Sequence, residues 1–85
     1  MAFIESQSLP AHVEVLALIA GGRRLCADEM VLDGEKHYFR FADDDEWREL
    51  VSARLVYGMR RKQLIRGRRY FEITSLGHRL LRDYG

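Results

Sequence analysis

The sequence predicts a small α+β domain with three helices and two short β-hairpins. Its 85 residues supply one hydrophobic core, so we expect residues 1–85 to form a single domain. The composition, with 47% hydrophobic and 32% charged residues, is typical of a folded globular protein. Segments with helical spacing of apolar residues alternate with short strand-like segments that are bounded by glycine, which favours helices and hairpins in one chain.

The first predicted helix covers residues 11–20. Val13 and Leu16 begin a stripe of apolar residues at helical spacing, Pro10 stands before the stripe, and a glycine pair follows it. Proline near the first turn and glycine beyond the last turn are typical helix boundaries.

The second predicted element is a hairpin over residues 29–41. Its two limbs flank Asp33 and Gly34, a pair that adopts the left-handed backbone of a tight turn at low cost. The aromatic alternation in residues 37–41 favours a strand for the second limb. A short helix over residues 27–32 is an alternative, so whether this stretch is a hairpin or contains a second helix stays open.

The third predicted element is a helix near residues 45–63. Asp43 and Glu46 match a D-x-x-E capping box, and acids at a helix start are stabilised by its exposed amides and its dipole. A metal site formed by the acids at 43–45 is the alternative, and we favour capping. The bases in the last turn of this helix are the part that most attracts a phosphate backbone.

The last two predicted elements are a basic hairpin and a closing helix. Residues 64–74 are expected to form two short strands around Gly67, which gives a basic wing. Thr74 or Ser75 can cap the last helix, in which Gly77 allows a close approach to the hairpin.

The apolar stripes of these elements are expected to meet in one core. Its expected members are Leu16, Ile19, Trp47, Leu50, Val51, Leu55, Phe71, Ile73, Leu80 and Leu81. The single cysteine, Cys26, cannot form an internal disulfide, and we expect it to be a buried apolar residue.

The charge is divided between the two halves of the chain. Residues 1–49 contain 11 acids and 5 bases, whereas residues 50–85 contain 9 bases and 2 acids, so a net charge of +1 conceals halves of −6 and +7. No acid occurs between Leu50 and Phe71. The surface formed by this stretch is expected to attract polyanions, unless its arginines pair with the acids of the first half.

The segment LIRGRRYFEITSLGHRLL, residues 64–81, resembles the wing and the following L-T-x-x-G-R-x-L-L step of winged-helix domains in small bacterial transcription regulators of the MarR and PadR type. Thr74 and Gly77 are in register with that step, and the resemblance covers about residues 45–83. It implies a winged helix-turn-helix-like fold and binding of double-stranded DNA. Residues 23–42 differ from the family pattern, because they resemble a hairpin where those families have a second helix.

The resemblance and the basic charge together predict one DNA-binding surface. Its expected residues are Arg48, Ser52, Arg60, Arg61, Lys62, Arg66, Arg68 and Arg69. Those of the wing would contact the backbone or enter the minor groove, while Arg48, Ser52 and Arg60 would face the major groove. A homodimer is also expected, through Leu18 and Ile19 of the first helix or Tyr84 of the last.

Other functional classes find less support in the sequence. His12, His37, His78 and Cys26 are scattered without catalytic or metal-ligand spacing, so we expect no enzyme, no cofactor and no metal. We expect a cytoplasmic protein, since the sequence has no signal peptide and no apolar run of the roughly 18 residues that a membrane span needs. The alternative to DNA binding is a protein-interaction module, such as a small phage-type inhibitor or a complex subunit, whose acidic half docks on a basic partner.

Overall fold

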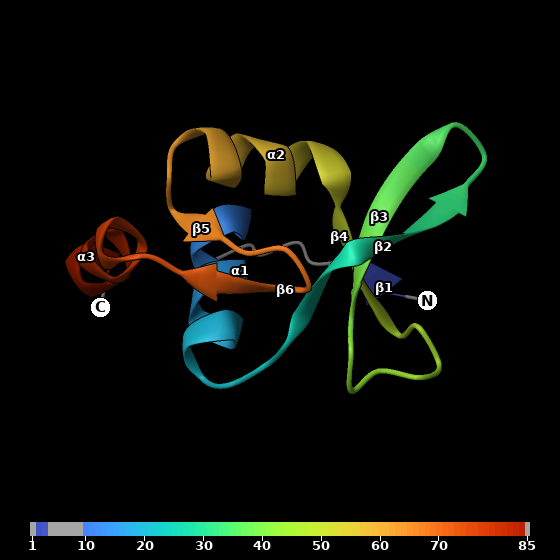
Figure 1. Cartoon of the computed structure of the whole chain (residues 1–85), viewed down its shortest axis with the longest axis horizontal. Coiled ribbons are helices and arrows are strands. Elements are labelled where there is room, and N and C mark those ends of the chain that lie inside the picture. Colours follow the sequence, from blue (N-terminus) through green and yellow to red (C-terminus); the bar gives the residue numbers. More distant parts are fainter. Residues whose placement is uncertain (1, 4–9, 85) are drawn as a thin grey trace.

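The computed structural model describes residues 2–3 and 10–84, which form a small α+β domain (Figure 1). Its elements are β1 (Ala2–Phe3), α1 (Ala11–Ala20), β2 (Leu25–Asp33), β3 (Lys36–Phe41), β4 (Glu49–Ser52), α2 (Ala53–Arg61), β5 (Ile65–Arg66), β6 (Tyr70–Ile73) and α3 (Ser75–Tyr84). The strands follow the order β1-β4-β3-β2-β6-β5, in which β1 pairs with β4 in parallel and the other neighbours are antiparallel. The predicted α+β class and the three helices are confirmed, and the strands outnumber those of two hairpins.

Two predicted elements are present at the expected place, the first helix and the hairpin that follows it. Helix α1 covers residues 11–20. The hairpin β2–β3 turns at Gly34, whose φ is 65°, and Asp33 pairs with Lys36 across the turn. The alternative helix over residues 27–32 is therefore wrong. Strand β2 is longer than predicted and contains a bulge between Leu25 and Met30, where its register against β3 shifts.

The helix expected near residues 45–63 is shorter, and a strand occupies its first part. Residues 49–52 form β4, and α2 begins only at Ala53. Leu50 and Val51 are opposite Arg40 and Phe39 of β3, a strand that lies close in space but not in sequence. Pairing with β3 therefore overrides the helical spacing of the apolar residues.

The predicted capping box is also wrong. Asp43 accepts a hydrogen bond from the side chain of Arg23 and none from a helix start, whereas Asp44 accepts one from the backbone N–H of Glu49 at 2.7 Å, which closes the loop that leads into β4. Trp47 lies in that loop with a φ of 53° and is 45% exposed, so it does not belong to the core.

The core consists of two clusters rather than one. The main cluster joins α1 and α2 to the sheet; its buried members are Val15, Leu16, Ile19, Leu25, Phe39, Phe41, Val51, Ala53, Val56, Met59, Leu64, Ile65 and Phe71, with Leu55, Ile73 and Leu80 packed against it. The second cluster contains Val31, Tyr38 and Leu50. Because successive strand residues point to opposite faces, Leu50 and Val51 serve different clusters.

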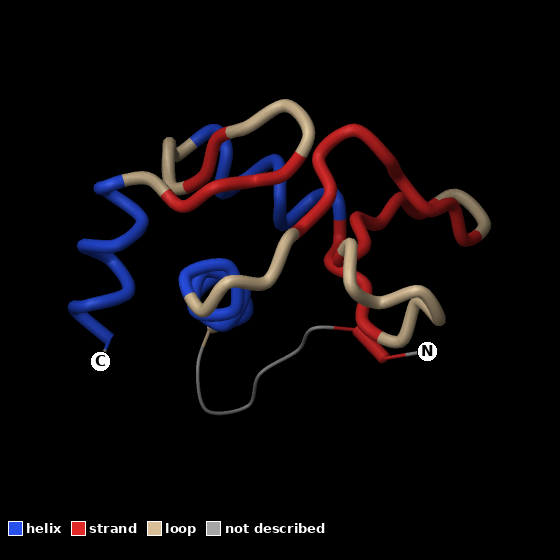
Figure 2. The backbone as a smooth tube through the Cα atoms, turned by 60° about the horizontal axis from the view of Figure 1, so that its bottom comes forward, coloured by secondary structure: helices blue, strands red, loops and turns tan. Residues whose placement is uncertain are grey.

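Helix α3 packs against α1 and β6 at one end of the domain. Figure 2 shows α1 nearly end-on, with α3 on the side away from the β2–β3 hairpin. Thr74 is the cap that the sequence predicts, since its Oγ1 accepts a hydrogen bond from the N–H of Gly77 at 3.1 Å and donates one to the carbonyl of Gln63 at 2.6 Å. This cap fixes the start of α3 beside the end of α2.

Candidate nucleic-acid interface

Four of the described acids of the first half pair with arginines of the same half. Within residues 10–84, the ion pairs are Arg23 with Asp43 (3.0 Å) and Glu49 (3.4 Å), Arg40 with Glu29 (3.1 Å), and Arg48 with Glu46. All of these residues lie between positions 23 and 49. Within residues 10–84, the acids of the first half therefore leave the arginines of the second half without an ion pair.

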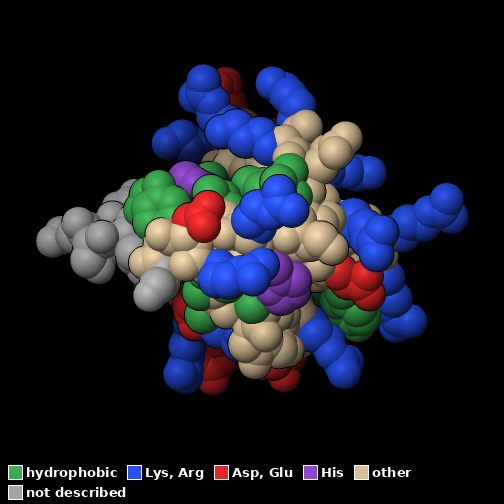
Figure 3. Space-filling view, turned by 90° about the vertical axis from the view of Figure 1, so that its left-hand side faces the viewer, with side chains coloured by type: hydrophobic (Ala, Val, Ile, Leu, Met, Phe, Trp, Pro, Cys, Tyr) green, Lys and Arg blue, Asp and Glu red, His purple; other side chains and the backbone are tan. Residues whose placement is uncertain are grey.

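The bases of the second half are spread over α2, the β5–β6 hairpin and α3. They are Arg54, Arg60, Arg61, Lys62, Arg66, Arg68, Arg69, Arg79 and Arg82, and none of them forms an ion pair with another residue in the described part of the chain. Figure 3 views the domain from the α3 end, where blue Lys and Arg side chains project around the margin and outnumber the red acids. A surface of this kind attracts anionic polymers.

A groove of about 650 Å³ lies between the end of α2, the β5–β6 turn and the start of α3. Its lining residues are Arg60, Gln63, Ile65, Arg66, Gly67, Ile73, Thr74, Ser75, Leu76 and His78. No acid lines it, and two of its lining side chains are arginines. The first turn of α3 adds backbone N–H groups, which favour an anion at a helix N-terminus. The groove can hold a phosphate group.

The end of α2 sets the position of the bases on one side of this groove. Arg60 and Arg61 occupy its last turn and Lys62 follows as the C-cap, where the helix dipole favours positive charge. Gln63 has a φ of 62°, so the chain leaves the helix in a left-handed conformation and turns directly into β5. This turn keeps Arg60 within the same groove as the hairpin.

The β5–β6 hairpin determines the position of the bases on the other side of the groove. Gly67 has a φ of 138°, and a Cβ atom there would lie 2.0 Å from the carbonyl oxygen of Tyr70, so the turn requires glycine. Beyond the turn, the guanidinium carbon of Arg69 lies 5.5 Å from the centroid of the Tyr70 ring, and that of Arg24 lies 5.7 Å from the same centroid. The two arginines therefore flank one aromatic ring.

The structure brings some of the predicted DNA-binding residues together and separates others. Arg60 and Arg66 line one groove. Arg61 lies in the last turn of α2 and Lys62 is its C-cap, whereas Arg68 and Arg69 lie in the turn between β5 and β6. Arg48 lies in the loop before β4, paired with Glu46, and Ser52 lies at the N-terminal end of α2. These two residues do not join the groove, because the helix that was expected to align them with Arg60 begins only at residue 53.

Sequence reasoning missed four groove residues and one arginine. Gln63, Thr74, Ser75 and His78 line the groove, although the sequence suggested only a capping role for the Thr-Ser pair. The T-S-x-x-H spacing at a helix start was the available signal. Arg24 precedes a strand far along the chain, and no local pattern connects it with Tyr70.

The remaining candidate residues do not form a second site. Cys26 is buried as expected, and this burial raises the pKa of its thiol. His12 is half-buried, whereas His37 is exposed rather than packed, and His78 is exposed. Among the described residues, no group of three or more His, Cys, Asp and Glu side chains could hold a metal ion.

Comparison of the chain with protein-family models, with curated proteins and with solved structures finds no match. None of the helices in the described ranges is long and apolar enough to span a membrane. The case for a function therefore depends on the chain's own residues.

Proposed function

We propose that this protein binds the phosphate backbone of double-stranded DNA through the end of α2, the β5–β6 hairpin and the start of α3, as a small transcriptional regulator would. The observation that supports the proposal most is the acid-free groove lined by Arg60, Arg66 and His78. The unpaired bases around it can neutralise phosphates and release counterions, which supplies most of the free energy of non-specific DNA binding.

The proposal keeps the resemblance to a winged helix but changes which elements touch DNA. The hairpin β5–β6 followed by α3 corresponds to the wing and the step after it. The hairpin β2–β3 stands where those families have a second helix. We therefore assign binding to the wing and to the last turn of α2, and we assign no base-reading role to Arg48 or Ser52.

The test measures the affinity for a duplex of random sequence at about 50 and 200 mM salt. Six bases, at 60–62, 66, 68 and 69, give an expected slope of log K against log [salt] of about −5, because each neutralised phosphate contributes about −0.9. The affinity of the wild-type protein should then fall about a thousandfold over this range.

A triple variant, Arg66→Ala with Arg68→Ala and Arg69→Ala, should bind more weakly and with about half the slope. Arg48→Ala is the matched control: it also removes an exposed arginine, but one at the other end of the domain, and should leave both quantities unchanged. A wild-type protein that does not bind at about 50 mM salt would reject DNA binding and favour the protein-interaction module.

A further inference from the structure

The outer half of β2 is an open sheet edge. Strand β6 pairs with β2 only at Leu25 and Cys26, and one further hydrogen bond joins the N–H of Ala27 to the carbonyl of Arg69. From residue 30 to residue 33, β2 pairs with β3 on one side, and from residue 28 to residue 33 no described strand pairs with it on the other. Alternate N–H and C=O groups of this segment therefore face outward, as on any edge strand.

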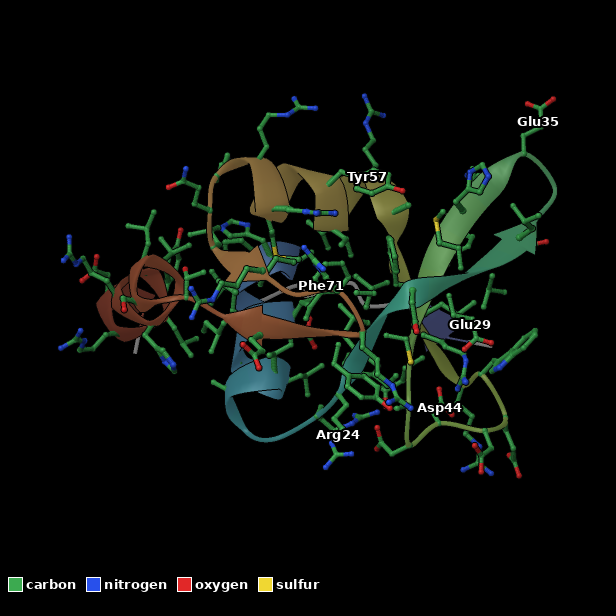
Figure 4. The ribbon with its side chains drawn as sticks, in the orientation of Figure 1. Arg24, Glu29, Glu35, Asp44, Tyr57 and Phe71 are labelled. Atoms are coloured by element: carbon green, nitrogen blue, oxygen red, sulfur yellow. The ribbon has the colours of Figure 1, made fainter. Side chains whose placement is uncertain are left out.

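An apolar strip lies along this edge. Met30 is 46% exposed and Leu32 is 66% exposed, and both point to the same face because they alternate with the buried Val31. Tyr57 of α2 is 44% exposed and donates a hydrogen bond to the sulfur of Met30 at 3.5 Å, which places its ring at the end of the strip. Figure 4 shows Tyr57 on α2 beside the β2–β3 hairpin.

The ring of Tyr57 is held in place by a contact with the core. Its ring meets the ring of Phe39 edge to face, with 5.8 Å between centroids, and Phe39 belongs to the main core. The strip is therefore a preformed surface supported by α2 and β3. An added strand could pack its own apolar side chains on it without first ordering the protein.

Acids surround the strip. Asp28, Glu29 and Asp33 belong to β2, and Glu35 lies at the hairpin tip (Figure 4). Arg40 pairs with Glu29 and Lys36 is opposite Asp33 in the ladder. Asp28, Asp33 and Glu35 form no ion pair within the described residues. The free edge is thus apolar at its centre and acidic at both ends.

The charges bear on which occupant fits the edge. In an antiparallel second copy, setting Met30 against Val31 or Leu32 places Asp33 opposite Asp28 or Glu29, and only the symmetric register, with Met30 against Met30, avoids such a pair and sets no acid against a cation. Like charges directly opposite each other destabilise a pair of strands. A strand that alternates apolar residues with lysine or arginine can instead pack on Met30 and Leu32 while its cations meet the acids.

We propose that the free edge of β2, residues 28–33, binds an extended basic segment of a partner protein as an additional β-strand. Backbone hydrogen bonds to the edge would supply part of the affinity, and alternate side chains on the strip would supply the selectivity. This interaction uses another surface than DNA binding, since the tip of the β2–β3 hairpin points away from α3 (Figure 1), and the two surfaces approach each other only at the inner end of the edge, where the carbonyl of Arg69 accepts a hydrogen bond from Ala27.

The test titrates nitrogen-15-labelled protein with a short peptide of alternating lysine and valine. The amide signals of residues 28–33 should shift and become protected from hydrogen exchange. The double variant Met30→Thr with Leu32→Thr keeps good strand formers at exposed positions and should weaken binding about tenfold or more, through loss of apolar burial. Leu76→Thr is the matched control, because Leu76 is 45% exposed on α3, and it should bind like the wild type.

Three results would overturn the proposal. Equal binding of a peptide with N-methyl groups on alternate amides would show that the edge makes no backbone hydrogen bonds. Equal binding of a peptide with glutamate in place of lysine would remove the role of the acids. A concentration-dependent doubling of mass that the Met30→Thr and Leu32→Thr variant abolishes would make a second copy the occupant.

Discussion

Replacing Gly77 by alanine should destabilise the protein and displace α3 from the groove. A Cβ atom at this position would lie 2.4 Å from the carbonyl oxygen of Leu64 and 2.7 Å from Cγ1 of Ile73. The oxygen cannot yield easily, because it accepts a hydrogen bond from the N–H of Thr74 at 3.0 Å. Forcing a methyl group into such a contact costs about 1–3 kcal/mol.

The helix preference of alanine opposes this cost. Alanine is better than glycine within a helix by about 1 kcal/mol. The clash should win, since one of the two neighbours is backbone, and we expect a net loss of up to about 2 kcal/mol. For a domain of this size, a loss of 1 kcal/mol lowers Tm by about 4–8 °C, which thermal unfolding followed by circular dichroism resolves.

Gly58→Ala is the matched control. Gly58 lies inside α2, and a Cβ atom there would meet nothing within 4 Å. The same substitution should therefore stabilise the protein by up to about 1 kcal/mol. If both variants shift Tm in the same direction, close packing of α3 on the hairpin is not the reason for glycine at position 77. The Gly77 variant should also bind duplex DNA more weakly, because Ser75 and His78 move with α3.

Three further predictions follow from the structure. Trp47→Ala should change the free energy of unfolding by less than about 0.5 kcal/mol, as for an exposed residue, whereas a buried tryptophan would cost about 3–5 kcal/mol; urea unfolding distinguishes the two. The hydrogen bond from the backbone N–H of Glu49 lowers the pKa of Asp44. Its contribution to stability is therefore full above the ordinary pKa of about 3.9 and is lost as the pH falls through the lower pKa of the folded protein. Asp44→Asn should be less stable than the wild type at pH 6 and lose less stability on acidification, and equal stability at pH 6 would show that the loop does not depend on this bond. A homodimer should use α3, where Leu76 and Tyr84 are exposed, and Tyr84→Ala should lower its mass in light scattering, whereas a wild-type monomer at high micromolar concentration would end this expectation.

The elements that the sequence predicted well have local signals. Helix α1 is bounded by Pro10 and a glycine pair, and the two hairpins turn at Gly34 and Gly67, where φ is positive. A turn or a cap depends on a few adjacent residues, so these positions can be recognised without tertiary information.

Strand β4 could not be predicted in the same way. Its apolar residues fit a helical stripe as well as a strand, and only pairing with β3 decides between the two. Because this stretch was predicted as a helix, Trp47 was wrongly expected in the core, and Arg48 and Ser52 were expected on the same side of that helix as Arg60. The groove residues near the hairpin were better predicted, because α2, β5 and β6 are consecutive and connected by short turns. Ile19, which was expected both in the core and at a dimer seam, is buried in the main core.

The two proposed surfaces should be separable by mutation. Helix α3 and the tip of the β2–β3 hairpin lie at opposite ends of the longest axis in Figures 1 and 2, whereas the β5–β6 turn reaches β2 at Ala27. A duplex in the groove should therefore leave the outer residues of the β2 edge, 30–33, accessible. The Met30→Thr and Leu32→Thr variant should therefore keep the duplex affinity and the salt slope of the wild type. The triple arginine variant should keep the amide shifts that the lysine-valine peptide induces. If either variant impairs both interactions, one shared electrostatic field rather than two distinct surfaces governs binding.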